Sequence, residues 1–378
     1  MTLQTYIYKN ILRNKRRTAL TVLSIGFSLF LLIVLYTFLD LLLNPPMTEQ
    51  SALRLAVKRS TSLADQMPMA YIEKVRKVPH VKQAIPLQWF NGVYKEPKNF
   101  FANFASDDTV FSMFPELQIS EHDKQAFARE KTGAIVGEGL MSRFNWKVGD
   151  RVTLLGTIFP VNLEFLIVGT YNHEMDKNNF YFHYDYLNES LGSPNQVGAI
   201  WVMTDAMENV PQVAENIDAL FRNSPAETKT DTEKAFVLGF VSMLGNVRVM
   251  VGSIMMVVVF TMLLVAASTM AMTIRERLRE IAILKAIGYT RNGILYLILG
   301  ESTLIGFLGF LTGSALAWSL NLIDLYKLTQ GFIQVFKPGA QIYLICLAVG
   351  VGIGLISGAI PALQAANMTI SEAARRLE

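Results

Sequence analysis

Four long apolar blocks dominate the pattern of hydrophobic and polar residues along this chain. They occupy residues 20–43, 247–273, 293–318 and 342–360, and few charges interrupt them. A helix that crosses the hydrocarbon core of a bilayer needs roughly 20 apolar residues, so each block is long enough. The pattern therefore predicts an α-helical membrane protein with four transmembrane helices.

The longest polar segment, residues 44–246, follows the first apolar block. Some runs in it alternate apolar and polar residues, as the run VKQAIPLQWFNGVY (81–94) does in the manner of an edge strand. Others, such as 210–221, have helical spacing. This mixture predicts an extracytoplasmic α+β domain between the first two spans. No proline follows residue 232 until far beyond the second block, which predicts one unbroken helix that extends this span outward as a stalk.

The basic residues decide the orientation expected in the membrane. Apolar residues make up 51% of the chain and charged residues only 17%, so the basic residues that flank the spans carry the positive-inside signal. They cluster before the first block and between the second and third: Lys9, Arg13, Lys15, Arg16, Arg17, Arg275, Arg277, Arg279, Lys285 and Arg291. We therefore expect a multi-pass protein of the bacterial cytoplasmic (inner) membrane with both termini in the cytoplasm.

Three shorter segments complete the expected layout. Residues 1–19 have apolar residues at helical spacing, which predicts an amphipathic helix on the inner surface. Residues 319–341 are expected to form a short outer loop, and residues 361–378 a cytoplasmic tail. The first block exceeds the roughly 7–15 residues of a signal-peptide core, so it is expected to remain as an anchor. The single cysteine, Cys346, lies in the fourth block, so no disulfide is expected in the outer domain.

The interval between the second and third blocks, residues 274–292, reads IRERLREIAILKAIGYTRN. As one helix it places Ile274 and Ile281 on a common face, with charged residues around the rest. Gly288 is expected to end this helix and Thr290 to cap the next one. A solvated loop that only obeys the positive-inside rule would not need an apolar run at its centre. The pattern favours a helix that docks on another protein.

Longer stretches of the chain resemble the FtsX/MacB-type permeases of ATP-binding-cassette (ABC) transporters. The segment IRERLREIAILKAIGYTRNGILYLILGESTLIGFLGFLTG (274–313) is similar to the core of that family. NILRNKRRTALTVLSIGFS (10–28) resembles its N-terminal signature, and GAIVGEGLMSRFNWKVGDRVTLLG (133–156) resembles the MacB-type extracytoplasmic core domain. IPALQAANMTISEAARR (360–376) resembles the family's ending. The resemblance points to the mechanotransmission (type VII) branch of these permeases.

The resemblance implies a coupling helix seated in a cleft of a cytoplasmic ABC ATPase. Its residues would be Glu276, Arg279, Glu280, Ile281, Ala282, Ile283, Leu284, Lys285, Ile287 and Gly288. It also implies a second permease, in a homodimer or a related heterodimer, and it is compatible with a periplasmic adaptor. The 378 residues contain no GxxxxGK[ST] phosphate loop, so ATP and Mg²⁺ are expected on a separate ATPase subunit. No cofactor and no enzymatic activity are expected in this chain itself.

Small, acidic and sulfur-containing residues mark the spans. Close helix packing, within the chain or across a dimer, is predicted by GxxxG pairs at Gly309, Gly313, Gly350, Gly354 and Gly358. Glu301 either binds a proton or a cationic substrate, or faces the bundle and pairs with a hydroxyl or an arginine. Seven methionines between 243 and 272 favour ordinary packing, with a surface that adapts to a greasy substrate as the alternative. His173, Glu174, Asp176 and His183 lack a recognised metal spacing, so no metal site is expected.

The sequence thus predicts a permease subunit that transmits the ATP-driven motion of its partner to an extracytoplasmic domain. Export or extraction of an amphipathic substrate, such as a lipoprotein, lipid, peptide or drug, would be the result. The alternative is an FtsX-like signalling protein that activates an extracytoplasmic partner such as a cell-wall hydrolase, and a third possibility is a receptor or channel that acts alone. Membrane lipids are expected partners, whereas nucleic acid is not, because the basic cluster adjoins a span.

Overall fold

The structure, a computed structural model, describes residues 13–45, 47–173, 176–243, 245–323, 325, 329 and 336–368. The chain divides into two compact units, which are described separately. The helical unit contains residues 1–44, 244–324 and 336–378, and the sheet unit contains residues 45–243 and 325–335. Most of the expected amphipathic helix, much of the 319–341 loop and the tail from 369 onward lie outside the described residues.

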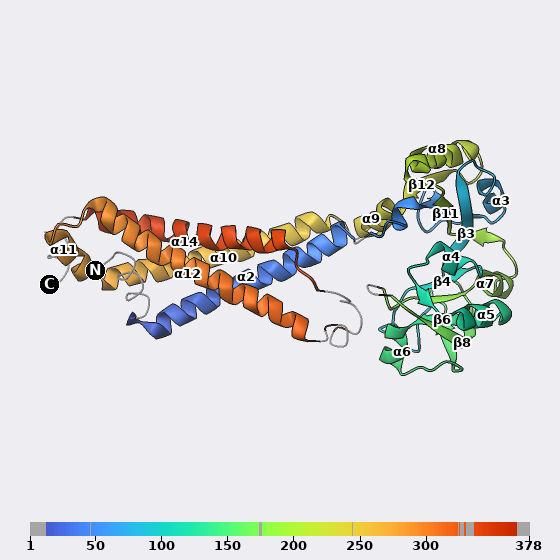
Figure 1. Cartoon of the computed structure of the whole chain (residues 1–378), viewed down its shortest axis with the longest axis horizontal. Coiled ribbons are helices and arrows are strands. Elements are labelled where there is room, and N and C mark those ends of the chain that lie inside the picture. The colour runs from blue at the N-terminus through green and yellow to red at the C-terminus, as the bar shows by residue number, and fades with distance from the viewer. Residues whose placement is uncertain are drawn as a thin grey trace. The chain divides into compact units, whose positions relative to one another are not determined.

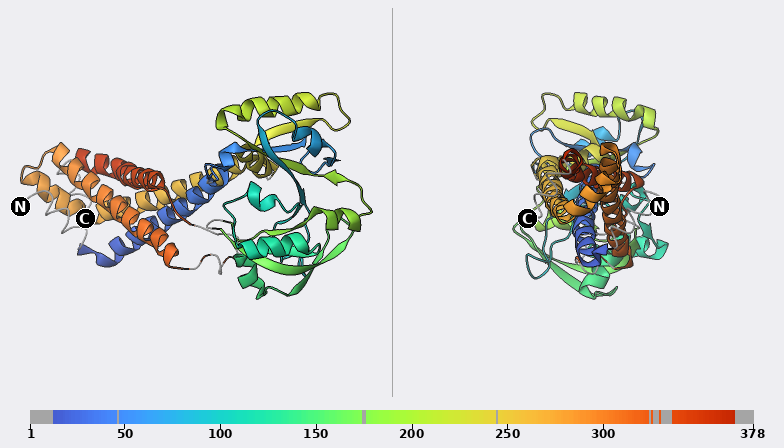
Figure 2. Two further views of the ribbon diagram at one scale, coloured as in Figure 1. Left: turned by 45° about the vertical axis from the view of Figure 1, so that its right-hand side comes forward. Right: turned by 90° about the vertical axis from the view of Figure 1, so that its left-hand side faces the viewer.

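Four long helices form the helical unit: α2 (Lys15–Leu43), α10 (Val247–Glu276), α12 (Arg291–Ser319) and α14 (Ala340–Asn367). The short helix α11 (Leu278–Ala286) joins α10 to α12, and the 3-10 turn η3 (Leu320–Leu322) follows α12. Each long helix is long and apolar enough to cross a membrane, which confirms the four predicted spans. Figures 1 and 2 show these helices gathered into one bundle.

Helix α14 continues beyond residue 360, where the sequence predicted the fourth span to end. Pro361 lies inside the helix, although a proline removes one backbone hydrogen bond and often ends a helix. Ala362, Ala365 and Ala366 follow it and pack into the apolar core of the bundle, with at most 4% of each exposed. Burial of this face offsets the missing hydrogen bond, so residues 361–367 belong to the helix and not to a tail.

The backbones of α12 and α2 touch at glycines. A Cβ atom added at Gly309 would lie 2.4 Å from Cγ2 of Ile25, and one added at Gly313 would lie 2.6 Å from the carbonyl oxygen of Gly26. Real Cβ atoms essentially never come within 3.0 Å of such atoms, so a larger residue would push the two helices apart. The glycines of α12 therefore set how closely it approaches α2.

A second glycine seam joins α12 to α14. A Cβ atom at Gly354 would lie 2.6 Å from the carbonyl oxygen of Ser302, and one at Gly306 would lie 2.3 Å from that of Gly350. A Cβ atom at Gly358 would meet the hydroxyl of Ser302 at 2.2 Å. All five glycines of the GxxxG pairs thus pack against other helices of the same chain.

The sheet unit is built on a ten-stranded mixed sheet in the order β12-β1-β11-β3-β4-β9-β6-β8-β5, with β7 paired to β8 and a separate β10-β2 pair. Its strands are β1 (Arg54–Arg59), β2 (Met67–Pro68), β3 (Val81–Trp89), β4 (Asn103–Ser106), β5 (Gln118–Ile119), β6 (Gly133–Gly137), β7 (Arg151–Leu155), β8 (Asn162–Asn172), β9 (Phe180–His183), β10 (Gln196–Val197), β11 (Ala199–Thr204) and β12 (Thr228–Thr232). Its helices and 3-10 turns are η1 (Ser51–Leu53), α3 (Tyr71–Val75), α4 (Val110–Met113), α5 (Glu121–Arg129), α6 (Glu138–Phe144), α7 (Tyr184–Ser190), η2 (Met207–Asn209), α8 (Val210–Leu220) and α9 (Glu233–Met243). This architecture confirms the predicted α+β class.

Both faces of this sheet are covered by apolar cores. Along β1, Leu55 and Val57 enter one buried cluster, whereas Ala56 between them enters the other. This assignment follows from the alternation of side chains along a strand. Because both faces are covered, the central strands are apolar at nearly every position, and the simple alternation of an exposed sheet is weak here.

The sequence pattern was wrong about the place of β3, which is a central strand and not an edge strand. It lies between β11 and β4, and its Pro86 is paired with Ile200 of β11. Pairing of β3 with β4 begins only at Leu87. The proline therefore lies just before the pairing with β4 begins, so its missing N–H takes no hydrogen bond from the pairing of β3 with β4.

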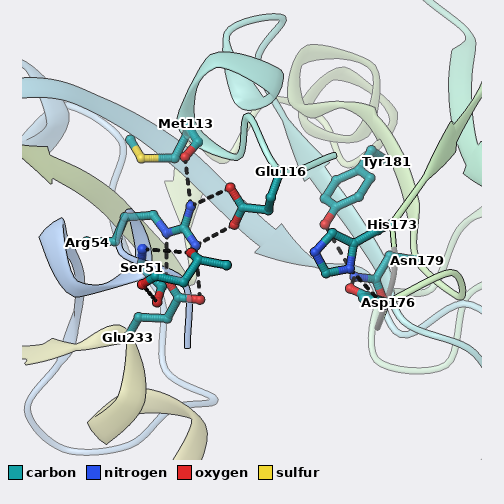
Figure 3. Close-up of polar contacts among 10 residues, drawn as sticks. Ser51, Arg54, Met113, Glu116, His173, Asp176, Asn179, Tyr181 and Glu233 are labelled. Carbon is teal, nitrogen blue, oxygen red and sulfur yellow. Dashed lines mark hydrogen bonds and ion pairs between the residues drawn. The ribbon is translucent and has the colours of Figure 1, made fainter. Parts of the chain in front are cut away.

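A buried arginine ties three segments of the sheet unit together. Arg54, the first residue of β1, is 1% exposed and lies between the carboxylates of Glu116 and Glu233, as Figure 3 shows. Its Nη1 donates to Glu116 Oε2 at 3.0 Å and to the carbonyl oxygen of Met113 at 3.1 Å. Burial acts to lower the pKa of Arg54, but the hydrogen bonds and charges of both glutamates outweigh this and raise it. Burial also raises the pKa of Glu233, against the opposing effect of Arg54.

The predicted unbroken helix through the stalk and second span is wrong. Helix α9 ends at Met243 and α10 begins at Val247. Between them Gly245 has a φ of 85°, in the left-handed region that stops a helix, and the side chain of Asn246 accepts a hydrogen bond from the N–H of Val249. A stop signal followed by a start signal interrupts the apolar pattern, so α9 and α10 are separate helices.

Helix α9 belongs to the sheet unit, where aromatic side chains hold it. Phe236 packs edge-to-face on Trp201 with ring centroids 5.6 Å apart, and Phe240 packs on Trp89 at 6.2 Å. Glu233, its first residue, pairs with Arg54. The helix that precedes the second span is thus fastened to the sheet at three points along its length.

Candidate functional site

The interval between α10 and α12 contains a joint that the sequence pattern does not show. Helix α10 continues to Glu276, Arg277 has the non-helical angles φ −108° and ψ 11°, and α11 then begins at Leu278. The expectation that Ile274 and Ile281 belong to one helix is therefore wrong. The two residues still lie in the same apolar cluster, because each helix turns its own isoleucine toward the bundle.

The end of α11 and the start of α12 follow the local signals. Gly288 has a φ of 101°, and its N–H donates to the carbonyl of Lys285, while the N–H of Tyr289 donates to that of Leu284. This pair of hydrogen bonds is the Schellman arrangement that glycine permits after a helix. The hydroxyl of Thr290 then accepts a hydrogen bond from the N–H of Gly293 at 3.2 Å, which caps α12.

One face of α11 anchors the helix to the bundle. Ile281 is 5% exposed and joins the apolar core of the helical unit, with Leu284 half-buried beside it. The ammonium group of Lys285 donates to the carbonyl oxygens of Ala366, at 2.8 Å, and of Met368. These acceptors end α14, where a cation also interacts favourably with the helix dipole. Ile281, Leu284 and Lys285, which the resemblance assigned to contact with the ATPase, thus contact the bundle of this chain.

The opposite face of α11 is exposed and partly apolar. Ile283 is 52% exposed and Ile287 is 73% exposed, and Arg279 and Ala286 lie on the same side of the helix at spacings of three and four residues. The predicted coupling residues therefore divide between two faces. Ile281, Leu284 and Lys285 hold the helix in place, whereas the exposed set forms an apolar ridge with a charged end.

Glu301, the acidic residue of the third span, faces the bundle. It is 5% exposed, and its Oε2 accepts a hydrogen bond from Nη1 of Arg277 at 2.7 Å. Arg277 also lies 3.4 Å from Oε2 of Glu280, as the i,i+3 spacing predicts. Glu276 pairs with Arg17 of α2 and not with Arg279, the partner that its spacing suggests. Nothing in the spacing of Arg277 and Glu301, which are 24 positions apart, points to their pairing.

A polar cavity of about 280 Å³ opens beside these ion pairs. Its walls come from the start of α2, the end of α10, the joint, the first turn of α11, and α12. The charged side chains in the walls are those of Arg13, Arg17, Glu276, Arg277, Glu280 and Glu301. The three cations and three carboxylates pair with one another, which balances the charge of the cavity.

The two histidines considered as metal ligands, His173 and His183, make hydrogen bonds within the sheet unit. Nδ1 of His173 accepts a hydrogen bond from the backbone N–H of Asp176 at 2.8 Å, as Figure 3 shows, and Nε2 of His183 lies 2.8 Å from the carbonyl oxygen of Phe127. Glu174 lies outside the described residues. Within the ranges that the structure describes, no three His, Cys, Asp or Glu side chains gather as a metal-ligand group.

Comparison with known families accounts for both units. The FtsX-like permease C-terminal family matches residues 252–370, which include α11 and the exposed ridge. The MacB-like periplasmic core domain family matches residues 18–220, more than half of the chain. The chain belongs to the FtsX/MacB-type family of ABC transporter permeases.

Two curated relatives of this FtsX/MacB-type permease match most of its length. The lipoprotein-releasing system transmembrane protein LolC of Haemophilus influenzae is 23% identical over 344 residues, which cover 83% of this chain and 82% of LolC. An uncharacterized ABC transporter permease of Methanocaldococcus jannaschii is 20% identical over 397 residues, with 98% of this chain and 97% of the relative covered.

Among solved structures, the extracellular domain of the ABC-type transporter YknZ from Gram-positive bacteria matches with a TM-score of 0.38 and 13% identity, and 47% of this chain and 99% of that chain are covered. The periplasmic region of MacB from Actinobacillus actinomycetemcomitans matches with a TM-score of 0.37 and 9% identity, over 50% of this chain and 92% of that chain.

Membership of the family gives this permease its general role. It is an ABC transporter permease, and the family implies a partner ATPase subunit. The FtsX-like match contains α11, the predicted coupling segment. The resemblance read from the sequence is therefore confirmed at the level of the family.

Proposed function

We propose that this permease couples ATP hydrolysis by a separate cytoplasmic ATPase to movement of its sheet unit, and that it exports or extracts an amphipathic substrate. The observation that supports this proposal most directly is the difference between the two faces of α11. One face is anchored to the bundle through Ile281 and Lys285, and the other exposes Ile283 and Ile287. The protein would lie in the bacterial inner membrane, with both termini in the cytoplasm and the sheet unit outside. A second permease, and a periplasmic adaptor where one is present, would complete the assembly.

The exposed face of α11 fits a groove on a partner better than it fits water. The cationic flanks favour a cytoplasmic position for this helix, where two large aliphatic side chains would otherwise contact solvent. Exposed apolar residues that cluster beside charged ones are typical of a protein interface. Arg279, at the start of the ridge, would add a directional hydrogen-bond donor at the rim of such a contact.

The substrate class rests on similarity. LolC is named as a transmembrane protein of a lipoprotein-releasing system, and this permease matches it over most of both chains. A lipoprotein or another acylated molecule is therefore the leading candidate. Ile283 and Ile287 would not contact such a substrate, since they would face the ATPase.

Pull-down of the tagged full-length chain from native membranes tests the proposal. We expect an ABC ATPase to co-purify with the wild type and to be lost from Ile287→Asp, because a carboxylate would enter an apolar contact. Leu322→Asp is the matched control, since Leu322 is 72% exposed but lies at the opposite end of α12 from α11. A wild-type pull-down without a nucleotide-binding subunit would reject the proposal, and full retention by Ile287→Asp would reject the docking face.

A further inference from the structure

The joint between α10 and α11 is held chiefly by side chains. Arg277 is the single residue between the two helices. Its N–H donates to the carbonyl of Ile274, and its carbonyl accepts from the N–H of Ile281, but its own backbone angles are not helical. Helix α11 has nine residues, and among them only the side chain of Ile281 is buried. Half-buried Leu284 and the hydrogen bonds of Lys285 to the end of α14 hold the second half of the helix, which leaves its first turn, next to the joint, freer to move.

The charged side chain at the joint removes this freedom. Arg277 reaches Glu301 of α12 at 2.7 Å and Glu280 of α11 at 3.4 Å, so one guanidinium group connects the joint to both neighbouring helices. The side chains of Arg277 and Glu301 are 16% and 6% exposed. A carboxylate inside a membrane helix is costly unless it is paired, so the pair has a strong preference to stay closed. The planar guanidinium group also has a fixed direction of hydrogen bonding, which a packed aliphatic pair lacks.

Two more ion pairs carry the connection to α2. Glu280 also pairs with Arg13, and Glu276 at the end of α10 pairs with Arg17. The polar cavity of about 280 Å³ lies against these pairs, and Arg13 and Glu276 are the most exposed of the four residues. These outer pairs can therefore exchange partners with water more readily than the inner pair of Arg277 and Glu301.

We propose that Arg277 and Glu301 are positioning residues of the coupling step. Their ion pair holds the α10–α11 joint at one angle against α12, so that a push on α11 moves α10 and α12 together. This inference rests on the proposed function, because it assigns a route to the movement that an ATPase would apply at α11. It also gives Glu301 a purpose other than binding a substrate or a transported proton.

Spin-label distances in the full-length permease in lipid nanodiscs test the joint itself. Labels at residue 283 of α11 and residue 296 of α12, both exposed sites, are introduced after Cys346→Ala. We expect one narrow distance distribution for the otherwise native chain and a broad one for Glu301→Gln or Arg277→Gln. The exchange Arg277→Glu with Glu301→Arg should restore the narrow distribution, and Arg275→Gln, which removes an exposed arginine next to the joint, should leave it unchanged.

Hydrolysis by the complex with its co-purified ATPase tests the consequence for coupling. We expect Glu301→Gln, without labels, to retain the bound ATPase but to change the rate of ATP hydrolysis in the complex about 2- to 30-fold. The charge exchange should reverse this change. A purely structural role would instead lower the yield of the assembled complex, and it would not distinguish the exchange from the single variants.

Several outcomes would overturn the inference. A narrow distribution in Glu301→Gln, or a broad one in the charge exchange, would show that the pair does not set the joint. If Glu301→Gln fails to accumulate in membranes, Arg277→Lys replaces it as the test variant. Lysine keeps the positive charge but lacks the planar guanidinium group with its fixed directions of hydrogen bonding. A distance distribution as narrow as that of the wild type in Arg277→Lys would reject the inference. Absence of any ATPase in the wild-type pull-down would reject the proposed function. The spin-label distances would still show whether the pair of Arg277 and Glu301 sets the angle of the joint.

Discussion

Loss of Arg54 should destabilise the sheet unit strongly, because it leaves two carboxylates without a cation. In Arg54→Met the volume is largely kept, but Glu116 and Glu233, whose side chains are 18% and 17% exposed, face each other unpaired. Removal of one partner from a buried ion pair typically costs about 3–5 kcal/mol, and the partial exposure of both carboxylates places this case near about 3 kcal/mol. For a unit of this size the thermal midpoint should fall by about 6–12 °C.

Tryptophan fluorescence during heating provides the assay. Trp89, Trp146 and Trp201 lie in the sheet unit, so its unfolding dominates the signal of the chain's four tryptophans. Arg151→Met is the matched control. Arg151 also pairs with a glutamate, Glu164, at 2.7 Å, but the two side chains are 70% and 52% exposed, so no measurable change is expected.

The pH dependence of the stability of Arg54→Met distinguishes two causes of its destabilisation, the unpaired carboxylates and the loss of packing. Burial without a cation raises the pKa of a carboxylate in the folded state, so the folded variant holds protons more tightly at low pH and loses them as the pH rises. The deficit of Arg54→Met should therefore grow from pH 5 to pH 8. A further variant with leucine at Glu116 and Glu233 should recover most of the loss. A midpoint within about 1 °C of the wild type at pH 8 would contradict the reasoning, given the size expected above.

The remaining predictions concern packing and one titration. Gly354→Leu should separate α12 from α14 and lower thermal stability by about 1–3 kcal/mol, whereas Gly352→Leu, where an added Cβ meets nothing within 4 Å, should have little effect; equal midpoints for the two variants would refute the glycine seam. Ile281→Ala should cost roughly 2 kcal/mol and Ile283→Ala close to nothing, and the reverse order in a thermal scan would refute the assignment of the two faces. The pKa of Glu233 is raised by burial in the folded state, so its contribution to stability is present below its unfolded pKa and lost as the pH rises through the folded value. The stability of Glu233→Gln relative to the wild type should therefore rise from about pH 4.5 upward. The measurement is the thermal midpoint of the variant minus that of the wild type at each pH. A difference that rises on acidification instead would contradict the reasoning.

Local signals in the sequence predicted the helix ends at the candidate site correctly. Gly288 ends α11 and Thr290 caps α12 as expected, because a helix end depends on the conformations that a few adjacent residues can adopt. The same kind of signal was present at Gly245 and Asn246, and the break between α9 and α10 could have been read from it. Continuous hydrophobicity concealed it, since an apolar run does not distinguish one helix from two.

The directions in which side chains point could not be predicted in the same way. The run from Ile281 to Leu284 has enough apolar residues for either face of α11 to be buried, and only the packing of α12 and α14 decides that Ile281 turns inward. The alternative of one helix through Arg277 is also reasonable from spacing. The structure instead ends α10 at Glu276 and begins α11 at Leu278, and the guanidinium group of Arg277 between them pairs with Glu301 on another helix.

By itself, the sequence determined the four spans, the α+β unit between the first two, the expected orientation and the family, because length, hydropathy and short motifs are properties of contiguous residues. The tertiary structure decided which glycines touch, since Gly26 and Gly306 matter only when a neighbouring backbone lies against them. It also decided that Arg54 joins Glu116 to Glu233, and that Glu301 meets Arg277. Each of these pairings joins residues far apart along the chain, and the free energy of burying a charge or closing a gap exists only after the helices and strands have packed.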